Sequence, residues 1–202
     1  SRRDKLTGLL NRETLEEEIT RIIILNHERI PPESVRHPEV PQDSREPKSE
    51  SKHWLAVLDI DHFKHVNDTF GHVYGDEILI LVSRLILQCV RSYDRVFRYG
   101  GEEFVILIRG SDLTDARATF ERMRTTVGHH GYAKVDQVTV SIGVAEVGFQ
   151  TSHAEVIAQA DEALYYAKNH GRDQIHFYDE LVAIGEIEPP AEPAQAGGVS
   201  FF

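Results

Sequence analysis

Residues 94–110 read DRVFRYGGEEFVILIRG, in which two apolar runs flank the glycine pair Gly100–Gly101. Valine, isoleucine and aromatic residues are typical of strands, and glycine permits the positive φ that a tight turn needs. The stretch therefore predicts a β-hairpin. Glu102 and Glu103 follow the glycines and would present hard carboxylate oxygens beside a backbone that a ligand can approach closely. An ordinary hairpin turn with solvated acidic side chains is the alternative for this segment taken alone.

A second acidic segment ends the apolar run WLAVLDID at residues 54–61, which has the length and composition of a buried strand. Asp59 and Asp61 lie at the carboxyl end of this predicted strand. Because side chains alternate along a strand, both carboxylates should point to the same face. The role of Asp61 stays open, with a structural hydrogen bond favoured.

Apolar periodicity predicts the remaining elements. Helices are predicted at residues 11–27, 75–91, 112–127 and 153–170, and further strands at 135–147 and 174–178. This order lacks a regular βαβ repeat and contains an adjacent hairpin. We therefore expect an α+β fold with a central, mainly antiparallel sheet surrounded by helices.

Two segments differ in composition from a packed domain. Residues 28–53 are rich in proline, serine and charged residues, which predicts an exposed loop insertion. Residues 182–202 end in a low-complexity segment and are expected to form a disordered tail. One globular domain is thus predicted over residues 1–181.

Charge and cysteine content restrict the partners and the environment. The 202-residue chain has 33 acidic and 22 basic residues, giving a formal net charge of -11. This charge disfavours binding to a nucleic-acid polymer or to an anionic membrane surface. Cys89 is the only cysteine and lies in an apolar run, so we expect a cytoplasmic protein in which Cys89 is a core residue.

The sequence contains no signal peptide and no run near the ~18–20 apolar residues of a membrane span. We expect no membrane contact from this segment. Because the sequence begins at Ser1 rather than methionine, we expect an upstream sensory region in the full-length protein, where a membrane anchor could also lie.

Several segments besides GGEEF at 100–104 carry a resemblance to a known family. They are DKLTGLLNR at 4–12, DIDHFKHVNDTFGHVYGDE at 59–77, VSIGVA at 140–145 and ADEALYYAKNHGRD at 160–173. In content and order they resemble the motifs of GGDEF-domain diguanylate cyclases. The resemblance implies a nucleotidyl cyclase or polymerase-palm-like α+β fold and covers nearly everything outside the insertion and the tail.

The resemblance also implies that two GTP molecules are condensed into cyclic di-GMP with release of pyrophosphate. Divalent cations suit this reaction, because they polarise the phosphoryl group and lower the pKa of the attacking hydroxyl. A Mg²⁺ or Mn²⁺ cofactor is therefore expected, held by Asp59, Glu102 and the backbone carbonyl of Ile60. Glu103, grouped with Glu102 as catalytic, either supports the metal ions or accepts the departing proton.

For the guanine base, the resemblance assigns Asn67 and Asp76. A carboxylate can accept the N1–H and the 2-amino group of guanine together, so Asp76 favours guanine over adenine. Turn formation and helix capping are the alternative roles of both residues. Contacts with the phosphates are expected from His62, Phe63, Lys64, Lys168 and Arg172. For the basic residues near the helix end, complementing the helix dipole is the alternative.

Arg91 and Asp94 bracket the motif RSYD, five residues before GGEEF. They match the RxxD site through which many family members are inhibited by cyclic di-GMP, and a helix-end salt bridge is the alternative. Arg122 on the next predicted helix is a further expected contact, contributed by a neighbouring domain. Because each domain of this family holds one GTP, the resemblance implies a homodimer for catalysis.

Two other functions stay open. One is a catalytically silent GGDEF module that binds GTP or cyclic di-GMP as a signalling receptor, and the other is a related cyclase with a different base preference. The presence of every expected metal and substrate side chain argues against the silent module. Glu102 stands where the family name has aspartate, and it keeps the carboxylate.

Overall fold

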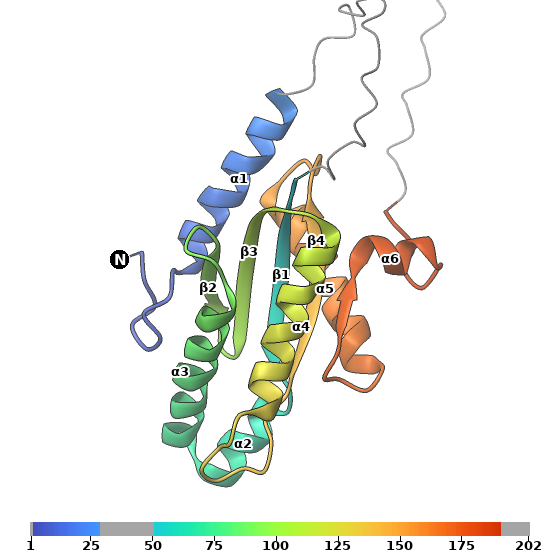
Figure 1. The fold of residues 1–202 in the computed structure, drawn as a ribbon. Helices are drawn as coiled ribbons and strands as arrows, with labels where there is room; N and C mark the ends of the chain where they lie inside the picture. The colour runs from blue at the N-terminus through green and yellow to red at the C-terminus, as the bar shows by residue number, and fades with distance from the viewer. Residues whose placement is uncertain (1, 29–50, 191–202) are drawn as a thin grey trace, which may run out of the picture.

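A computed structural model describes residues 2–28 and 51–190 of the chain (Figure 1). The helices are α1 (Arg12–Glu28), α2 (Phe63–Phe70), α3 (His72–Cys89), α4 (Leu113–His129), α5 (His153–Asn169) and α6 (Tyr178–Ala183). The strands are β1 (Lys52–Ile60), β2 (Arg95–Gly100), β3 (Glu103–Ser111), β4 (Val140–Val147) and β5 (Ile175–Phe177).

The strands form one sheet in the order β2-β3-β1-β4-β5. The central strand β1 is antiparallel to both β3 and β4, β2 is antiparallel to β3, and the short edge strand β5 is parallel to β4. The predicted α+β fold with a mainly antiparallel sheet is therefore confirmed, as is the hairpin at the glycine pair.

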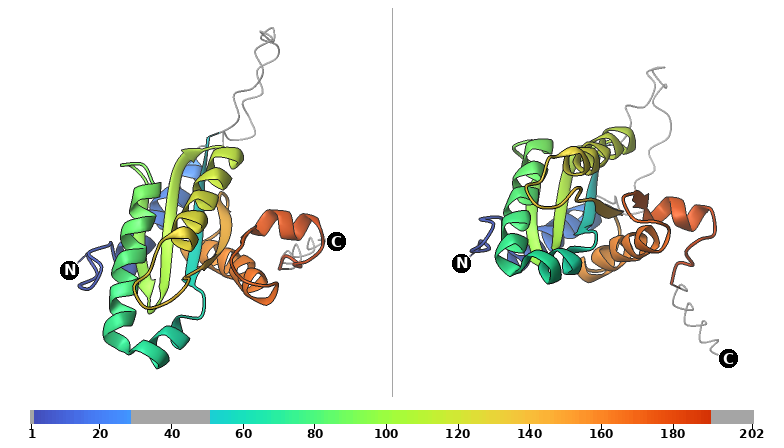
Figure 2. Two further views of the ribbon diagram at one scale, coloured as in Figure 1. Left: turned by 60° about the horizontal axis from the view of Figure 1, so that its bottom comes forward. Right: turned by 90° about the horizontal axis from the view of Figure 1, so that it is seen from below.

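Both faces of the sheet are covered by helices, which explains why β1 is apolar along most of its length. Ala56 and Leu58 belong to a core under α3 and α4. Leu55 and Val57 point to the other face and belong to a core under α1 and α5. Figures 1 and 2 show the two helix pairs on opposite sides of the sheet. Any side chain at an odd position of β1, Asp59 included, therefore faces α5.

Two short helices lie where the sequence analysis predicts none. Helix α2 has 8 residues, buries Phe63 and Val66, and lies between the predicted strand at 54–61 and the predicted helix at 75–91. Helix α6 has 6 residues and buries Tyr178 and Leu181. Each covers so few turns that its apolar periodicity cannot be separated from that of a loop.

The structure moves several predicted boundaries. The strand predicted at 135–147 begins only at Val140, and the helix predicted at 75–91 begins at His72. Strand β1 begins at Lys52, inside the predicted insertion 28–53, whose residues 29–50 lie outside the described part of the chain. Helix α6 crosses the boundary expected after residue 181, so the packed domain extends at least to Ala183. Of the predicted tail, residues 191–202 are not described. No helix within residues 2–28 and 51–190 is long and apolar enough to cross a membrane.

Candidate active site

The carboxylates expected to hold metal ions gather where β1 ends and β3 begins. In the antiparallel register Asp59 lies opposite Glu103 of β3 on one side and opposite Ser141 of β4 on the other. Glu102 is in the turn that immediately precedes Glu103, and both glutamates are half-buried. The residue Asp59 is only 5% exposed. Sequence positions more than 40 residues apart thus meet at one edge of the sheet, as the resemblance implies.

The turn that presents the glutamates is fixed by an arginine that the sequence analysis did not single out. Arg98 of β2 donates to the carbonyl oxygen of Gly101 at 2.9 and 3.2 Å and to the Asp4 carboxylate at 3.1 and 3.2 Å. Asp4 also accepts hydrogen bonds from the backbone N–H and hydroxyl of Thr7. Gly101 has φ +41°, a conformation that favours glycine. The N-terminal motif therefore holds the GGEEF turn in place.

Helix α5 brings a cation to the same edge. Lys168 Nζ lies 3.0 Å from the Asp59 carboxylate. This contact depends on a close approach of α5 to β4: a β-carbon at Gly143 would lie 2.1 Å from the Ala160 carbonyl oxygen and 2.2 Å from the Leu164 nitrogen. Only glycine fits there. Lys168 was expected at the phosphates, and in this structure its ammonium pairs with a carboxylate of the site.

Burial and like charges shift the acidity of these carboxylates. Burial raises the pKa of Asp59 from 3.8 to about 6, the Lys168 ammonium opposes the shift, and the negative charges of Glu102 and Glu103 add to it. Burial also raises the pKa of Glu103, and the nearby negative charge of Asp161 on α5 adds to that shift. Asp161 was not predicted as a site residue, although it lies within the quoted motif ADEALYYAKNHGRD.

The donor set fits a hard divalent cation. Four carboxylates and one ammonium leave an excess of negative charge at the strand edge, and this excess adds to the burial that raises the pKa values of Asp59 and Glu103. Within the described residues, no three His, Cys, Asp or Glu side chains form a ready metal cluster. Mg²⁺ commonly takes one or two protein carboxylates and completes its shell with water and substrate phosphates. The pair Asp59 and Glu102 meets that requirement.

Asp61 has the structural role that the sequence analysis favoured. Its carboxylate accepts hydrogen bonds from the hydroxyls of Thr139 and Ser141 at 2.8 and 2.7 Å and from the backbone N–H of Asp173 at 3.0 Å. These contacts join the end of β1 to β4 and to the segment after α5. That segment carries Arg172, so Asp61 helps to fix the position of a predicted phosphate contact.

The predicted phosphate contacts come from two turns beside the carboxylates. His62 has φ 56° and precedes α2, where Phe63 is buried and Lys64 is exposed. The Ile60 side chain is buried, so only its backbone can face a ligand. Arg172 is exposed, has φ 61°, and its N–H caps α5 at the Ala167 carbonyl oxygen. As expected, Lys168 and Arg172 lie at one end of α5.

The predicted guanine contacts lie on α2 and α3, which meet at Gly75. Asn67 of α2 lies so close to Gly75 of α3 that a β-carbon there would be 1.9 Å from its side-chain oxygen. Asp76 follows Gly75 and is exposed. The structure thus places the Asn67 amide against the helical turn that carries Asp76.

The RSYD motif forms a compact turn after α3 rather than a salt bridge. Asp94 is 7% exposed, and its carboxylate accepts the backbone N–H groups of Arg91 at 2.9 Å and Arg109 at 3.1 Å. The Arg91 guanidinium is exposed and donates to the Tyr93 hydroxyl at 2.8 Å. Arg122 donates to the Cys89 carbonyl oxygen at 2.6 Å, which places it beside the segment leading to Arg91.

Comparisons with known proteins agree with this arrangement. Diguanylate cyclase DgcM of Escherichia coli (strain K12) is 36% identical over 172 residues, which are 85% of this chain and 37% of DgcM. The GGDEF domain of DgcB from Caulobacter crescentus, solved in complex with c-di-GMP, is 30% identical with a TM-score of 0.72, covering 88% of this chain and 93% of that one. The active GGEEF domain of a diguanylate cyclase from Vibrio cholerae is 26% identical with a TM-score of 0.67, covering 84% and 97%.

The chain therefore spans little more than a third of the length of DgcM, a curated relative that it matches. The model of the family described as "Diguanylate cyclase, GGDEF domain" matches residues 39–174, well over half of the sequence. Together with the carboxylates at the β1–β3 edge and the fold around them, this match shows that the chain belongs to the GGDEF domain family.

Proposed function

We propose that this domain is a diguanylate cyclase that condenses two GTP molecules into cyclic di-GMP and releases two pyrophosphates. The observation that carries the proposal is the pairing of Asp59 with Glu103 across β1 and β3, with Lys168 Nζ 3.0 Å from Asp59. The Vibrio cholerae relative is described as active with a GGEEF motif, which supports glutamate at position 102. We assign the activity to residues 1–183, ending with α6.

The reaction consists of two phosphodiester-forming steps. In each, the ribose 3′-oxygen of one nucleotide forms a bond to the α-phosphorus of the other, the bond from that phosphorus to the oxygen bridging the α- and β-phosphates breaks to release pyrophosphate, and the hydroxyl proton leaves. The first step links the two GTP molecules, and the second closes the ring of the linear dinucleotide. Asp59, Glu102 and the Ile60 carbonyl would hold Mg²⁺ or Mn²⁺, which when bound stabilises negative charge on the phosphoryl oxygens. The protein itself must orient the two nucleotides and take up the proton.

We propose Glu103 as the proton acceptor. Burial and the charge of Asp161 raise its pKa, so it binds a proton more strongly than an exposed glutamate does. Lys168 and Arg172 lie at one end of α5, where their charges can bind the phosphates. Lys64 and the backbone of residues 62–63 would contact the phosphates from the turn before α2.

Asn67 and Asp76 would select guanine. The two side chains lie on α2 and α3, next to the close contact at Gly75. One carboxylate accepting two neighbouring N–H groups discriminates strongly against adenine, which presents an acceptor at N1. We propose that Asp76 receives the N1–H and the 2-amino group, and that Asn67 contacts the remaining edge.

Because one domain presents one such site, the two GTP molecules must be supplied by two facing domains. We therefore propose a homodimer as the working enzyme, acting in the cytoplasm where GTP is available.

The direct test is to incubate the purified chain with GTP and MgCl₂ and to resolve the products by chromatography. We expect cyclic di-GMP with GTP and none with ATP. Glu103→Gln, which keeps the size of the side chain, should bind GTP and lose at least a hundredfold in turnover. GTP binding without product from the wild-type chain, over a range of protein concentrations, would identify a silent receptor instead.

We further propose that cyclic di-GMP inhibits the domain at Arg91, Asp94 and Arg122. The exposed Arg91 guanidinium can donate to phosphate or to a guanine edge, and Asp94 fixes the turn that carries it. Arg91→Ala should weaken cyclic di-GMP binding in calorimetry about tenfold or more and leave the initial turnover unchanged. Arg84→Ala, an exposed arginine on α3, is the matched control. If the affinity of Arg91→Ala for cyclic di-GMP is unchanged, the product does not bind at Arg91 and this proposal is wrong.

A further inference from the structure

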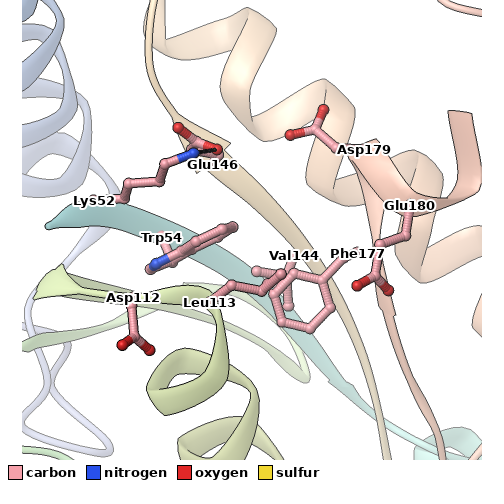
Figure 3. A pocket seen from close by; sticks show the side chains of 9 residues that line it. All are labelled: Lys52, Trp54, Asp112, Leu113, Val144, Glu146, Phe177, Asp179 and Glu180. Carbon is pink, nitrogen blue, oxygen red and sulfur yellow. Dashed lines mark hydrogen bonds and ion pairs between the residues drawn. The ribbon is translucent and has the colours of Figure 1, made fainter. Parts of the chain in front are cut away.

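A cavity of about 310 Å³ lies at the end of the sheet remote from the carboxylate edge (Figure 3). Lys52, the first residue of β1, lines it, whereas Asp59 is near the last, so roughly 23 Å of strand separates the two sites. Strands β1, β4 and β5 and the starts of α4 and α6 supply its walls. None of the motifs assigned to GTP or cyclic di-GMP contributes a side chain to it.

The floor of the cavity is apolar and aromatic. The rings of Trp54 and Phe177 meet edge to face with centroids 5.7 Å apart, and Leu113 and Val144 complete the surface. The Trp54 N–H already donates to the Ser111 carbonyl oxygen at 3.0 Å. The indole therefore presents only its apolar surface to the cavity, which suits a hydrocarbon or an aromatic ring.

The rim is acidic. Glu146 pairs with Lys52 at 2.9 Å, and Glu180 pairs with Arg117, whose guanidinium lies 4.4 Å from the Phe177 ring centroid. The Phe177 ring thus already accepts one cation. In Figure 3 the Asp179 carboxylate projects over the cavity toward Glu146. Within the described residues, the Asp179 carboxylate forms no hydrogen bond or ion pair.

These features select the charge and shape of a ligand. An anion would meet four carboxylates against one ammonium among the lining residues. A neutral apolar molecule would leave the Asp179 carboxylate unpaired beside it, and a strongly hydrated inorganic cation would gain nothing from the aromatic floor. Burial and the neighbouring Glu146 charge raise the pKa of Asp179, and the Lys52 ammonium opposes the shift.

We propose that this cavity binds an organic ammonium ion with an aromatic or alkyl body. The ammonium would lie between Asp179 and Glu146, and the apolar body would pack against Trp54 and Phe177. A single ring with a short chain matches a cavity at the small end of the ligand-pocket range. The site is independent of the cyclase reaction and would make the domain responsive to a second small molecule.

The chain carries its own reporter, since Trp54 is the only tryptophan and lines the cavity. Titrating the full chain with 2-phenylethylammonium should change the tryptophan emission saturably. The neutral isostere 2-phenylethanol should bind at least tenfold more weakly. Asp179→Asn should weaken ammonium binding about tenfold, and Glu13→Gln, which removes one exposed charge on α1, should not. Melting curves of each variant confirm folding.

A catalytic variant separates this proposal from the cyclase assignment. Glu103→Gln should bind 2-phenylethylammonium as the wild type does, whatever its turnover. The proposal is overturned by the absence of a saturable emission change, by equal affinity for the alcohol, or by unchanged affinity in a folded Asp179→Asn variant.

Discussion

Metal binding requires the ionised form of Asp59, whereas the stability of the metal-free fold favours the protonated form. A metal ligand must be ionised, yet the residue is 5% exposed, and burial raises its pKa to about 6 even with Lys168 Nζ 3.0 Å away. The folded-state pKa therefore exceeds the ordinary value of 3.8, and the folded chain binds more protons than the unfolded chain between these values. Stability falls as pH rises through this window, and the penalty is fully present above about pH 6.

Asp59→Asn should therefore abolish turnover and stabilise the metal-free fold at pH 7.5. The shift corresponds to roughly 3 kcal/mol at most, and loss of the Lys168 ion pair offsets part of it, so we expect a melting temperature roughly 2–6 °C above that of the wild type. Melting in EDTA at pH 7.5 and pH 4 measures this. The difference should shrink at pH 4, where wild-type Asp59 is largely protonated, and a variant less stable than the wild type at both pH values would contradict the argument.

Asp161 should influence the pH at which the acid limb of the pH–rate profile lies, because its charge helps to raise the pKa of Glu103. Asp161→Asn removes this charge and should lower that pKa. Glu103 would then lose its proton at lower pH, and the acid limb of kcat/KM should move toward lower pH. Glu162→Gln, at the exposed neighbouring position of α5, should leave the profile in place. An unmoved limb in Asp161→Asn would show that Glu103 is not the proton acceptor.

At the scale of elements, the contact between α2 and α3 shapes the predicted guanine site. A β-carbon at Gly75 would collide with the end of the Asn67 side chain and would lie 3.3 Å from Phe63 Cζ. The end of an asparagine side chain can swing away, whereas a backbone cannot. Gly75 thus fixes where Asn67 lies without touching a substrate itself.

Gly75→Ala should leave the domain folded and impair GTP binding. Alanine stabilises a helix interior relative to glycine, so the melting temperature should not fall, while KM for GTP should rise about tenfold as Asn67 is displaced. The double variant Asn67→Ala/Gly75→Ala tests the mechanism, since it should have the same KM as Asn67→Ala alone. If the two changes raise KM additively, the effect of Gly75→Ala on GTP binding does not act through Asn67.

The sequence predicts those elements whose apolar pattern runs over many residues. The run at 54–61, the hairpin around Gly100–Gly101 and the long helix α5 all appear where the pattern places them. Helix α2 was missed because 8 residues with two buried positions resemble a turn. The contact of Arg98 with Gly101 and Asp4 was also missed, because it depends on how distant segments meet in space.

On the scale of the whole domain, residues 2–28 and 51–190 present a single carboxylate edge at one end of the sheet. Lys168 of α5 contacts this edge through Asp59, and the residues proposed to bind the phosphates and the guanine lie after α5 and on the α2–α3 pair. The proposed reaction combines two GTP molecules, so a second domain must supply the other nucleotide. The same reasoning makes turnover depend on encounters between domains.

Turnover per chain should therefore rise with protein concentration until pairing saturates. A mixing experiment tests this pairing. Asp59→Asn chains should be folded but inactive, and a threefold excess of them is added to a fixed amount of wild type. Most wild-type domains should then form mixed dimers in which one of the two sites lacks the Asp59 carboxylate. The rate of cyclic di-GMP formation should then fall severalfold, whereas the same mass of serum albumin should not change it. Since the inactive chain keeps its GTP-contacting residues, GTP must be kept saturating so that substrate depletion does not imitate the effect. A rate per chain that is independent of both concentration and added variant would mean that one domain completes the reaction alone, and the proposed homodimer would be wrong.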